Sequence, residues 1–185
     1  MKIIILDRDG VINYDSDEYI KNVDEWEFLP NSLEAISRLN GLGFTIIVCT
    51  NQSGITRGLF SVDELNKMHE KMHKAIRIAG GEIAAIFVCP HIAEDNCECR
   101  KPKTKMLNDI CERFNIDDTK QLMMVGDSKT DLEAISQIGG IPILVKTGKG
   151  KNTFLKGQLP TNTLVFKDLL DFTDYLINKE EDNND

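Results

Sequence analysis

The sequence predicts an α/β protein with a Rossmann-like, mostly parallel sheet and helices on both faces. Short apolar runs rich in β-branched residues alternate with amphipathic segments, the pattern of successive βαβ units. Uninterrupted apolar runs are typical of strands buried on both faces. A length of 185 residues suits a single domain with a full-sized core. We therefore expect one domain over residues 1–178 and a polar, frayed tail over residues 179–185.

The individual elements follow from where each periodic segment starts and stops. The predicted strands are residues 2–6, 44–50, 84–89, 121–126, 141–146 and 163–166. The predicted helices are residues 31–42, 61–79, 103–114, 130–138 and 167–178. Ser61 and Glu64 form a capping-box pattern at the second helix, and Asn31 is the expected N-cap of the first. The connections 13–30 and 89–102 are long, which is typical of functional loops.

Composition excludes several classes of protein. A net charge of −8 argues against a nucleic-acid partner, because such proteins carry basic surfaces. No apolar run approaches the roughly 20 residues of a membrane span, and the start lacks a signal-peptide pattern. We expect a cytoplasmic protein with no membrane partner and, by default, a monomer. Basic residues cluster at 100–105 and 146–151, which suits a small anionic substrate.

The most informative stretch joins a buried strand to two carboxylates. The apolar run 3–6 is followed at once by Asp7, Arg8, Asp9 and Gly10. Open α/β sheets bind ligands at the carboxyl ends of their strands. Two acids there can hold a divalent cation, or one can attack an electrophile while the other moves a proton. Asp-x-Asp-Gly is also a turn signal, so the other strand ends must decide between the two interpretations.

Those other strand ends also carry polar side chains. The second strand runs into Thr50, Asn51, Gln52 and Ser53 before a glycine, a dense set of groups that can cradle phosphate oxygens. The fourth strand ends at Asp127, which could complete a Mg²⁺ site with the carboxylates of the first strand.

Three further charged residues are candidates for the same edge of the sheet. Asp131 lies in the first turn of the next helix, where it either binds the metal or only supports the helix terminus. Lys101 could neutralise the charge of a transferred phosphoryl group. Arg100 could recognise a second anionic group or sugar hydroxyls.

The long loop at 89–102 also predicts a zinc site. Its four potential ligands are Cys89, His91, Cys97 and Cys99. Three thiols and one imidazole within one loop match a Cys₃His site, and four protein ligands leave no open position for catalysis. The zinc would therefore be structural and would order a loop that has little core of its own.

Two other classes of protein must be weighed. His69, Glu70 and His73 fit H-E-x-x-H, the zinc-metallopeptidase signature. The two histidines flank the apolar stripe of their helix and no third ligand is evident, so we interpret them as helix-surface residues. A phosphoacceptor receiver domain also places aspartates at strand ends, but the zinc loop and the position of Asp9 two residues after Asp7 argue against it.

Taken together, the four strand-end motifs resemble those of the haloacid dehalogenase (HAD) superfamily of phosphohydrolases. The resemblance covers residues 3–148 in the expected order, with the motifs at 7–13, 50–54, 101 and 126–131. Asp-Arg-Asp-Gly-x-Ile-Asn, Thr-Asn-Gln-Ser-Gly-Ile, the Arg57–Gly58 pair and the zinc loop are similar to one subfamily in particular. It contains the D-glycero-D-manno-heptose 1,7-bisphosphate phosphatases and related histidinol-phosphate phosphatases. This resemblance implies a core without a large cap domain.

The resemblance also implies an activity and a set of roles. It implies Mg²⁺-dependent hydrolysis of the 7-phosphate of a heptose 1,7-bisphosphate, or alternatively of histidinol phosphate or another small sugar phosphate. Asp7 would form an aspartyl-phosphate and Asp9 would act as acid and base. Thr50 and Lys101 would stabilise the phosphoryl group. Mg²⁺ would be held by Asp7, the Asp9 backbone carbonyl and Asp127. The implied substrate-binding residues are Asp15, Tyr19, Asn51, Gln52, Ser53, Arg57 and Arg100.

Overall fold

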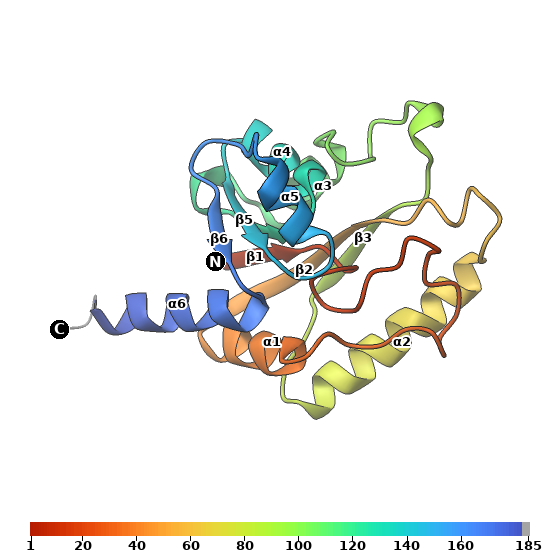
Figure 1. Cartoon of the computed structure of the whole chain (residues 1–185). Helices are drawn as coiled ribbons and strands as arrows, with labels where there is room; N and C mark the ends of the chain where they lie inside the picture. Colours follow the sequence, from red (N-terminus) through yellow and green to blue (C-terminus); the bar gives the residue numbers. More distant parts are fainter. Residues whose placement is uncertain (183–185) are drawn as a thin grey trace.

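The computed structural model describes residues 1–182 and shows one six-stranded parallel sheet with helices on both faces (Figure 1). The strands are β1 (Lys2–Leu6), β2 (Phe44–Asn51), β3 (Ala85–Cys89), β4 (Met123–Gly126), β5 (Ile141–Val145) and β6 (Leu164–Phe166). The helices are α1 (Ser32–Gly41), α2 (Val62–Ile78), α3 (Lys105–Phe114), α4 (Lys129–Gln137), α5 (Gly150–Lys156) and α6 (Leu169–Asp182). Single 3₁₀ turns lie at Ala93–Asp95 and Thr119–Gln121. The predicted fold class is confirmed.

The strand order places the ends of β1 and β4 side by side at the centre of the sheet. The order is β3-β2-β1-β4-β5-β6, so the chain moves outward from β1 in one direction and returns to build the other half. Leu6 of β1 is in register with Val125 of β4, and the Asp7 N–H donates to the Val125 carbonyl at 2.9 Å. A change of direction of this kind opens a crevice at the carboxyl ends of the strands.

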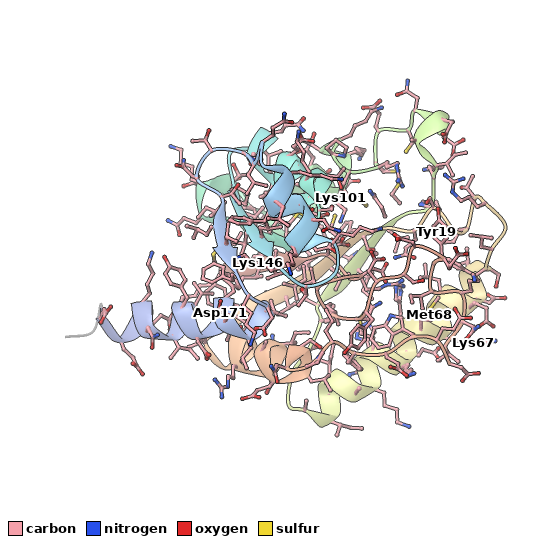
Figure 2. All side chains as sticks on the ribbon, viewed as in Figure 1. Tyr19, Lys67, Met68, Lys101, Lys146 and Asp171 are labelled. Carbon is pink, nitrogen blue, oxygen red and sulfur yellow. The ribbon has the colours of Figure 1, made fainter. Side chains whose placement is uncertain are left out.

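Alternate residues of each central strand serve two different core layers. Ile4 and Leu6 pack in the layer formed with α1, α2 and α6, where Met68 of α2 is fully buried. Ile3 and Ile5 pack in the opposite layer with α3 and α4. Figure 1 shows the first group of helices below the sheet and the second above it, and Figure 2 labels Met68 on α2. Burial on both faces explains why β1 has no polar alternation.

The structure corrects several expected boundaries. Apart from the last helix, every predicted element is present with ends within two residues of those expected. α5 was not predicted, because it is short, begins at Gly150 and overlaps the basic cluster at 146–151. Ser61 accepts the Glu64 N–H as predicted, at 3.2 Å. Asn31 has a left-handed backbone with φ of 67° and makes no side-chain cap.

The expected frayed tail is helical in its first part. α6 continues to Asp182, where Lys179 lies over the ring of Tyr175 and Glu180 pairs with Lys2. Residues 183–185 of the predicted tail lie outside the described part of the chain. No helix within residues 1–182 combines the length and the apolar character needed to cross a membrane.

Candidate active site

The segment that follows β1 passes close to the side chain of Asp127, which follows β4. Gly10 has a positive φ of 79°, and a Cβ there would lie only 2.1 Å from the Asp127 carboxylate. Gly148, in the turn after β5, would place a Cβ 2.2 Å from the same carboxylate. Glycine is therefore required at both positions, because any larger side chain would occupy the space of Asp127.

A buried lysine joins the carboxylates at this edge. The Lys101 ammonium lies 3.1 Å from Asp7 and 2.6 Å from Asp131, and donates to the Cys49 carbonyl at 2.6 Å. Burial opposes its charge, but the Asp131 and Asp7 carboxylates raise the pKa of Lys101 above its ordinary value. Asn51 fixes the backbone of this lysine by accepting its N–H at 3.1 Å and donating to its carbonyl at 3.2 Å.

The acidic cluster consists of Asp7, Asp127 and Asp131, each of which offers one carboxylate oxygen within 4.8 Å of the others. Burial, followed by the Asp131 carboxylate, raises the pKa of Asp7 to about 7. Burial, followed by Asp131 and Asp7, raises the pKa of Asp127 to about 8. Lys101 therefore does not balance the whole charge of the cluster. Hard carboxylate oxygens with uncompensated charge fit a cation such as Mg²⁺.

Asp131 supports the first turn of α4, as one of the two sequence interpretations predicted, and it also faces the buried lysine. Its Oδ2 accepts the Ser128 N–H at 3.1 Å, in a capping box at the start of α4. Its Oδ1 faces Lys101, and its side chain is completely buried.

Asp9 is held by three neighbouring side chains rather than by the acidic cluster. The Arg8 guanidinium donates to both of its carboxylate oxygens, at 2.9 and 3.0 Å from Nη2. Asn13 donates to Oδ1 and Gln52 to Oδ2, both at 2.7 Å. Burial opposes ionisation, but the Arg8 charge and these hydrogen bonds hold the pKa of Asp9 below its usual value. Gln52 also donates to the buried Thr50 hydroxyl at 2.9 Å.

Most of these groups line a cavity of about 290 Å³ at the carboxyl ends of the central strands, whereas Thr50 is buried and lies outside the lining. Figure 2 labels two of its lining residues from separate loops, Tyr19 after β1 and Lys101 after β3. The reactive and metal candidates that line it are Asp7, Asp9, Lys101, Asp127 and Asp131. The predicted substrate-binding residues that line it are Asp15, Tyr19, Asn51, Gln52, Ser53 and Arg100. Arg57 is exposed and lies outside this lining.

The turn after β5 contributes residues that sequence reasoning missed. The Lys149 N–H donates to Asp127 Oδ2 at 2.7 Å, and the Thr153 hydroxyl donates to the Asp127 carbonyl at 2.8 Å. The Lys149 ammonium pairs with Asp15 at 3.0 Å and Asp17 at 3.5 Å. The only signal for this role was the basic, glycine-containing run after a strand.

The cysteine–histidine cluster consists of Cys89, His91, Cys97 and Cys99, whose ligand atoms lie within 4.8 Å of one another. Its sulfur–sulfur distances are 3.1, 3.5 and 3.7 Å, and the His91 Nδ1 lies 3.2 Å from the Cys99 sulfur. Tetrahedral zinc with bonds of about 2.3 Å would place its sulfurs about 3.8 Å apart. All four cysteine and histidine side chains thus fit a closed zinc site, and the cysteines are free thiols.

The H-E-x-x-H motif does not form a comparable cluster. Within residues 1–182, the groups of three or more candidate ligands do not include His69 or His73. The His69 Nε2 instead lies 3.5 Å from the Arg8 guanidinium, which is a cation. The metallopeptidase interpretation therefore has no third ligand in the described chain.

Comparison with known proteins agrees with this arrangement. The family described as polynucleotide kinase 3 phosphatase matches residues 2–153. The chain is 52% identical over 179 residues to a protein of Neisseria meningitidis serogroup A, covering 96% of this chain and 95% of that one. It is 50% identical over 169 residues to a Pseudomonas putida protein, covering 91% and 95% of the two chains. Both are named D-glycero-beta-D-manno-heptose-1,7-bisphosphate 7-phosphatase.

Solved structures show the same relationship. A D,D-heptose 1,7-bisphosphate phosphatase from B. bronchiseptica, complexed with magnesium and phosphate, has a TM-score of 0.94 at 48% identity and covers 97% of this chain and 99% of its own. The corresponding phosphatase from Burkholderia thailandensis has a TM-score of 0.76 at 46% identity and covers 95% and 99%. The chain therefore belongs to the D-glycero-D-manno-heptose 1,7-bisphosphate 7-phosphatase family of the haloacid dehalogenase superfamily.

Proposed function

We propose that this chain hydrolyses the 7-phosphate of D-glycero-β-D-manno-heptose 1,7-bisphosphate. The observation that carries the proposal is the placement of Asp7. Its carboxylate stands at the switch point of the sheet, 3.1 Å from a buried lysine and within the acidic cluster. The names of the relatives at 52% and 50% identity support the substrate and its β anomer.

Asp7 is the proposed nucleophile. Its carboxylate oxygen bonds to phosphorus while the bond from phosphorus to the sugar oxygen breaks, which leaves an aspartyl-phosphate. Asp9, whose lowered pKa leaves it ionised near pH 7, first takes up a proton from solvent and then donates it to the departing sugar oxygen. In the second half of the reaction Asp9 takes a proton from water, whose oxygen displaces Asp7 from phosphorus and releases inorganic phosphate. Both aspartates line the same cavity.

Lys101 and Thr50 are proposed to support the phosphoryl group. The Lys101 ammonium restrains Asp7 and offers positive charge, since burial among carboxylates keeps it protonated. Mg²⁺ would be held by Asp7, the backbone carbonyl of Asp9 and Asp127. Asp131 would support this site by pairing with Lys101. Bound Mg²⁺ would neutralise phosphate charge. The magnesium and phosphate in the B. bronchiseptica structure support this choice of metal.

The remaining lining residues are proposed to bind the sugar and its second phosphate. Asp15 and Tyr19 come from the loop after β1, and Arg100 comes from the loop after β3. The Arg100 guanidinium donates to the His91 carbonyl at 3.1 Å, so its position depends on the cysteine–histidine cluster. We propose that this cluster holds a structural Zn²⁺ that orders the loop carrying Arg100 and Lys101.

A substrate panel tests the proposal. Purified protein with Mg²⁺ should release phosphate from the β anomer of heptose 1,7-bisphosphate with a higher kcat/KM than from the α anomer. Histidinol phosphate should be a poorer substrate than both. A preference for histidinol phosphate would overturn the substrate while leaving the chemistry of Asp7 intact. No phosphatase activity on any phosphate monoester would overturn the function itself.

A further inference from the structure

Arg8 stands between the two aspartates of the first motif, and the proposed mechanism gives it no role. Its side chain is only 1% exposed, although it carries a permanent charge. Burying a guanidinium is costly unless its N–H groups are paired. An apolar side chain could fill this space at a lower desolvation cost. The contacts of Arg8 therefore indicate what its charge does.

Most of these contacts converge on the Asp9 carboxylate. Nη2 of Arg8 reaches both oxygens of Asp9, at 2.9 and 3.0 Å, and Nε reaches Oδ1 at 3.2 Å. The same Nη2 donates to the Gln52 Oε1 at 3.2 Å, and Gln52 in turn donates to Asp9 Oδ2 at 2.7 Å. Two-point contact of this kind fixes the plane of a carboxylate as well as its position.

The other face of the guanidinium contacts His69. Nη1 of Arg8 lies 3.5 Å from the His69 Nε2, and because arginine can only donate, this ring nitrogen must accept. Burial and the Arg8 charge lower the pKa of His69 to about 4, so the ring is neutral near pH 7 and can accept. Leu65, Met68 and Met72 fix the helix that carries His69 in the core. His69 thus connects a rigid helix to a guanidinium.

We propose that Arg8 is a positioning residue for the acid–base Asp9, and that His69 positions Arg8. The inference rests on the proposed function, in which Asp9 protonates the leaving oxygen. The line from α2 through His69 and Arg8 to Asp9 fixes the direction from which that proton arrives. Proton transfer requires donor and acceptor within hydrogen-bond reach, so a carboxylate with a free rotamer loses most of its effect.

The chemistry of the leaving group separates loss of acid catalysis from general loss of structure, which would lower activity on every substrate. Breaking the bond to an alkyl oxygen needs a proton, whereas p-nitrophenolate leaves without one. The kcat/KM value covers all steps through the first irreversible one, here departure of the leaving group. The test therefore compares kcat/KM for p-nitrophenyl phosphate with that for the best alkyl phosphate in the panel above.

Arg8→Met should lower kcat/KM about 100-fold on the alkyl phosphate, since general acid catalysis is worth roughly 10²–10⁴-fold. Its kcat/KM on p-nitrophenyl phosphate should stay within about threefold of the parental value. His69→Leu should show the same selective loss at about 3–10-fold. The matched control is His73→Leu, one turn along the same helix. Within residues 1–182 the ring of His73 makes no hydrogen bond to Arg8, so the kcat/KM values of His73→Leu on both substrates should equal those of the parent.

Equal losses on both substrates for Arg8→Met, or no loss on the alkyl phosphate, would overturn the inference. If Arg8→Met does not fold, Arg8→Lys and His69→Leu replace it in the test. Parental kcat/KM values on both substrates in these two variants would overturn the inference. Asp9→Asn distinguishes failure of the inference about Arg8 from failure of the proposed role of Asp9. Its loss should be selective for the alkyl phosphate, and an equal loss on both substrates would overturn the proposed role of Asp9 itself.

Discussion

The acidic cluster and the cysteine–histidine cluster both gather metal-ligating side chains, but the fold builds them differently. The acidic cluster takes its members from the ends of β1 and β4 and the first turn of α4, all fixed by the sheet. The cysteine–histidine cluster takes all four members from the end of β3 and the loop that follows it. The core therefore positions the acidic cluster, whereas the loop after β3 depends on its own cysteine–histidine cluster for a fixed conformation.

The two clusters also differ in charge and access. The acidic cluster opens into the central cavity and keeps carboxylates whose pKa values burial raises to about 7 and about 8. The other cluster offers four ligands to one ion, which leaves no position for substrate. We infer that an unbalanced, open cluster on strand ends serves chemistry, while a closed cluster in a loop serves structure.

The largest expected effect removes the nucleophile from the acidic cluster. Asp7→Asn should lower the rate of phosphate release by about 10⁴-fold or more, because no other carboxylate is in place to form the covalent intermediate. The measurement is steady-state turnover, with thermal unfolding to show that the variant is folded. Glu70→Gln, on α2, should keep full activity. The reverse pattern would exclude the phosphatase assignment and revive the H-E-x-x-H motif.

The second effect removes one ligand from the cysteine–histidine cluster. Cys97→Ser should release the bound zinc, expected at one per chain, and lower the free energy of unfolding by about 3 kcal/mol, on the order of 10 °C in Tm. Metal analysis and thermal unfolding measure both quantities. Cys111→Ser, a thiol of α3 outside the cluster, is the control and should keep its zinc. A Cys97→Ser protein with unchanged zinc and Tm would contradict a structural site.

The third effect concerns the charge of the acidic cluster. Without Mg²⁺, Asp7 and Asp127 bind protons more tightly when folded than when unfolded, since their pKa values rise from 3.8 to about 7 and about 8. The folded state then holds more protons, so stability falls as pH rises from about 4 to about 8. We expect a loss of at least about 2 kcal/mol between pH 5.5 and pH 8, which is the contribution of Asp7 alone.

Thermal unfolding in Mg²⁺-free buffer across this range measures the slope. Added Mg²⁺ should stabilise the protein more at pH 8 than at pH 5.5, because binding must displace protons at the lower pH. Asp127→Asn should show a smaller slope and a weaker response to Mg²⁺. Stability that rises with pH in the Mg²⁺-free parent protein would show that the cluster does not carry excess negative charge.

The same comparison shows what sequence alone can reveal. The strand before Asp7 and the strand before Asp127 are local patterns, and their adjacency follows from the general geometry of parallel sheets. The four zinc ligands lie within eleven residues, so their proximity needs no knowledge of the fold. These parts of the site were predicted because the signal lies within a few consecutive residues.

The missed parts depend on contacts between distant segments. The motif assigned no role to Arg8, and only the packing of α2 and the turn after β2 reveals its partners His69 and Gln52. Asn31, the expected cap, has a left-handed backbone and makes no side-chain cap hydrogen bond. Lys149 and Thr153 contact Asp127 across more than twenty residues of sequence.

The smallest effect tests whether the turn after β5 belongs to the acidic cluster. The Thr153 hydroxyl donates to the backbone carbonyl of Asp127 at 2.8 Å, so it fixes the residue without touching its carboxylate. Thr153→Val should cost about 1 kcal/mol of stability, the usual value of such a bond. It should also weaken apparent Mg²⁺ affinity about threefold, because a freer Asp127 must be ordered on binding.

Thr163→Val is the matched control, since its hydroxyl makes the same kind of bond to the Pro160 carbonyl, before β6. It should lose similar stability and keep the parental Mg²⁺ dependence of turnover. Equal Mg²⁺ dependence in both variants would mean that the sheet alone positions Asp127 and that the turn only closes over it. A selective effect of Thr153→Val would instead extend the acidic cluster into α5, a helix that the sequence did not predict.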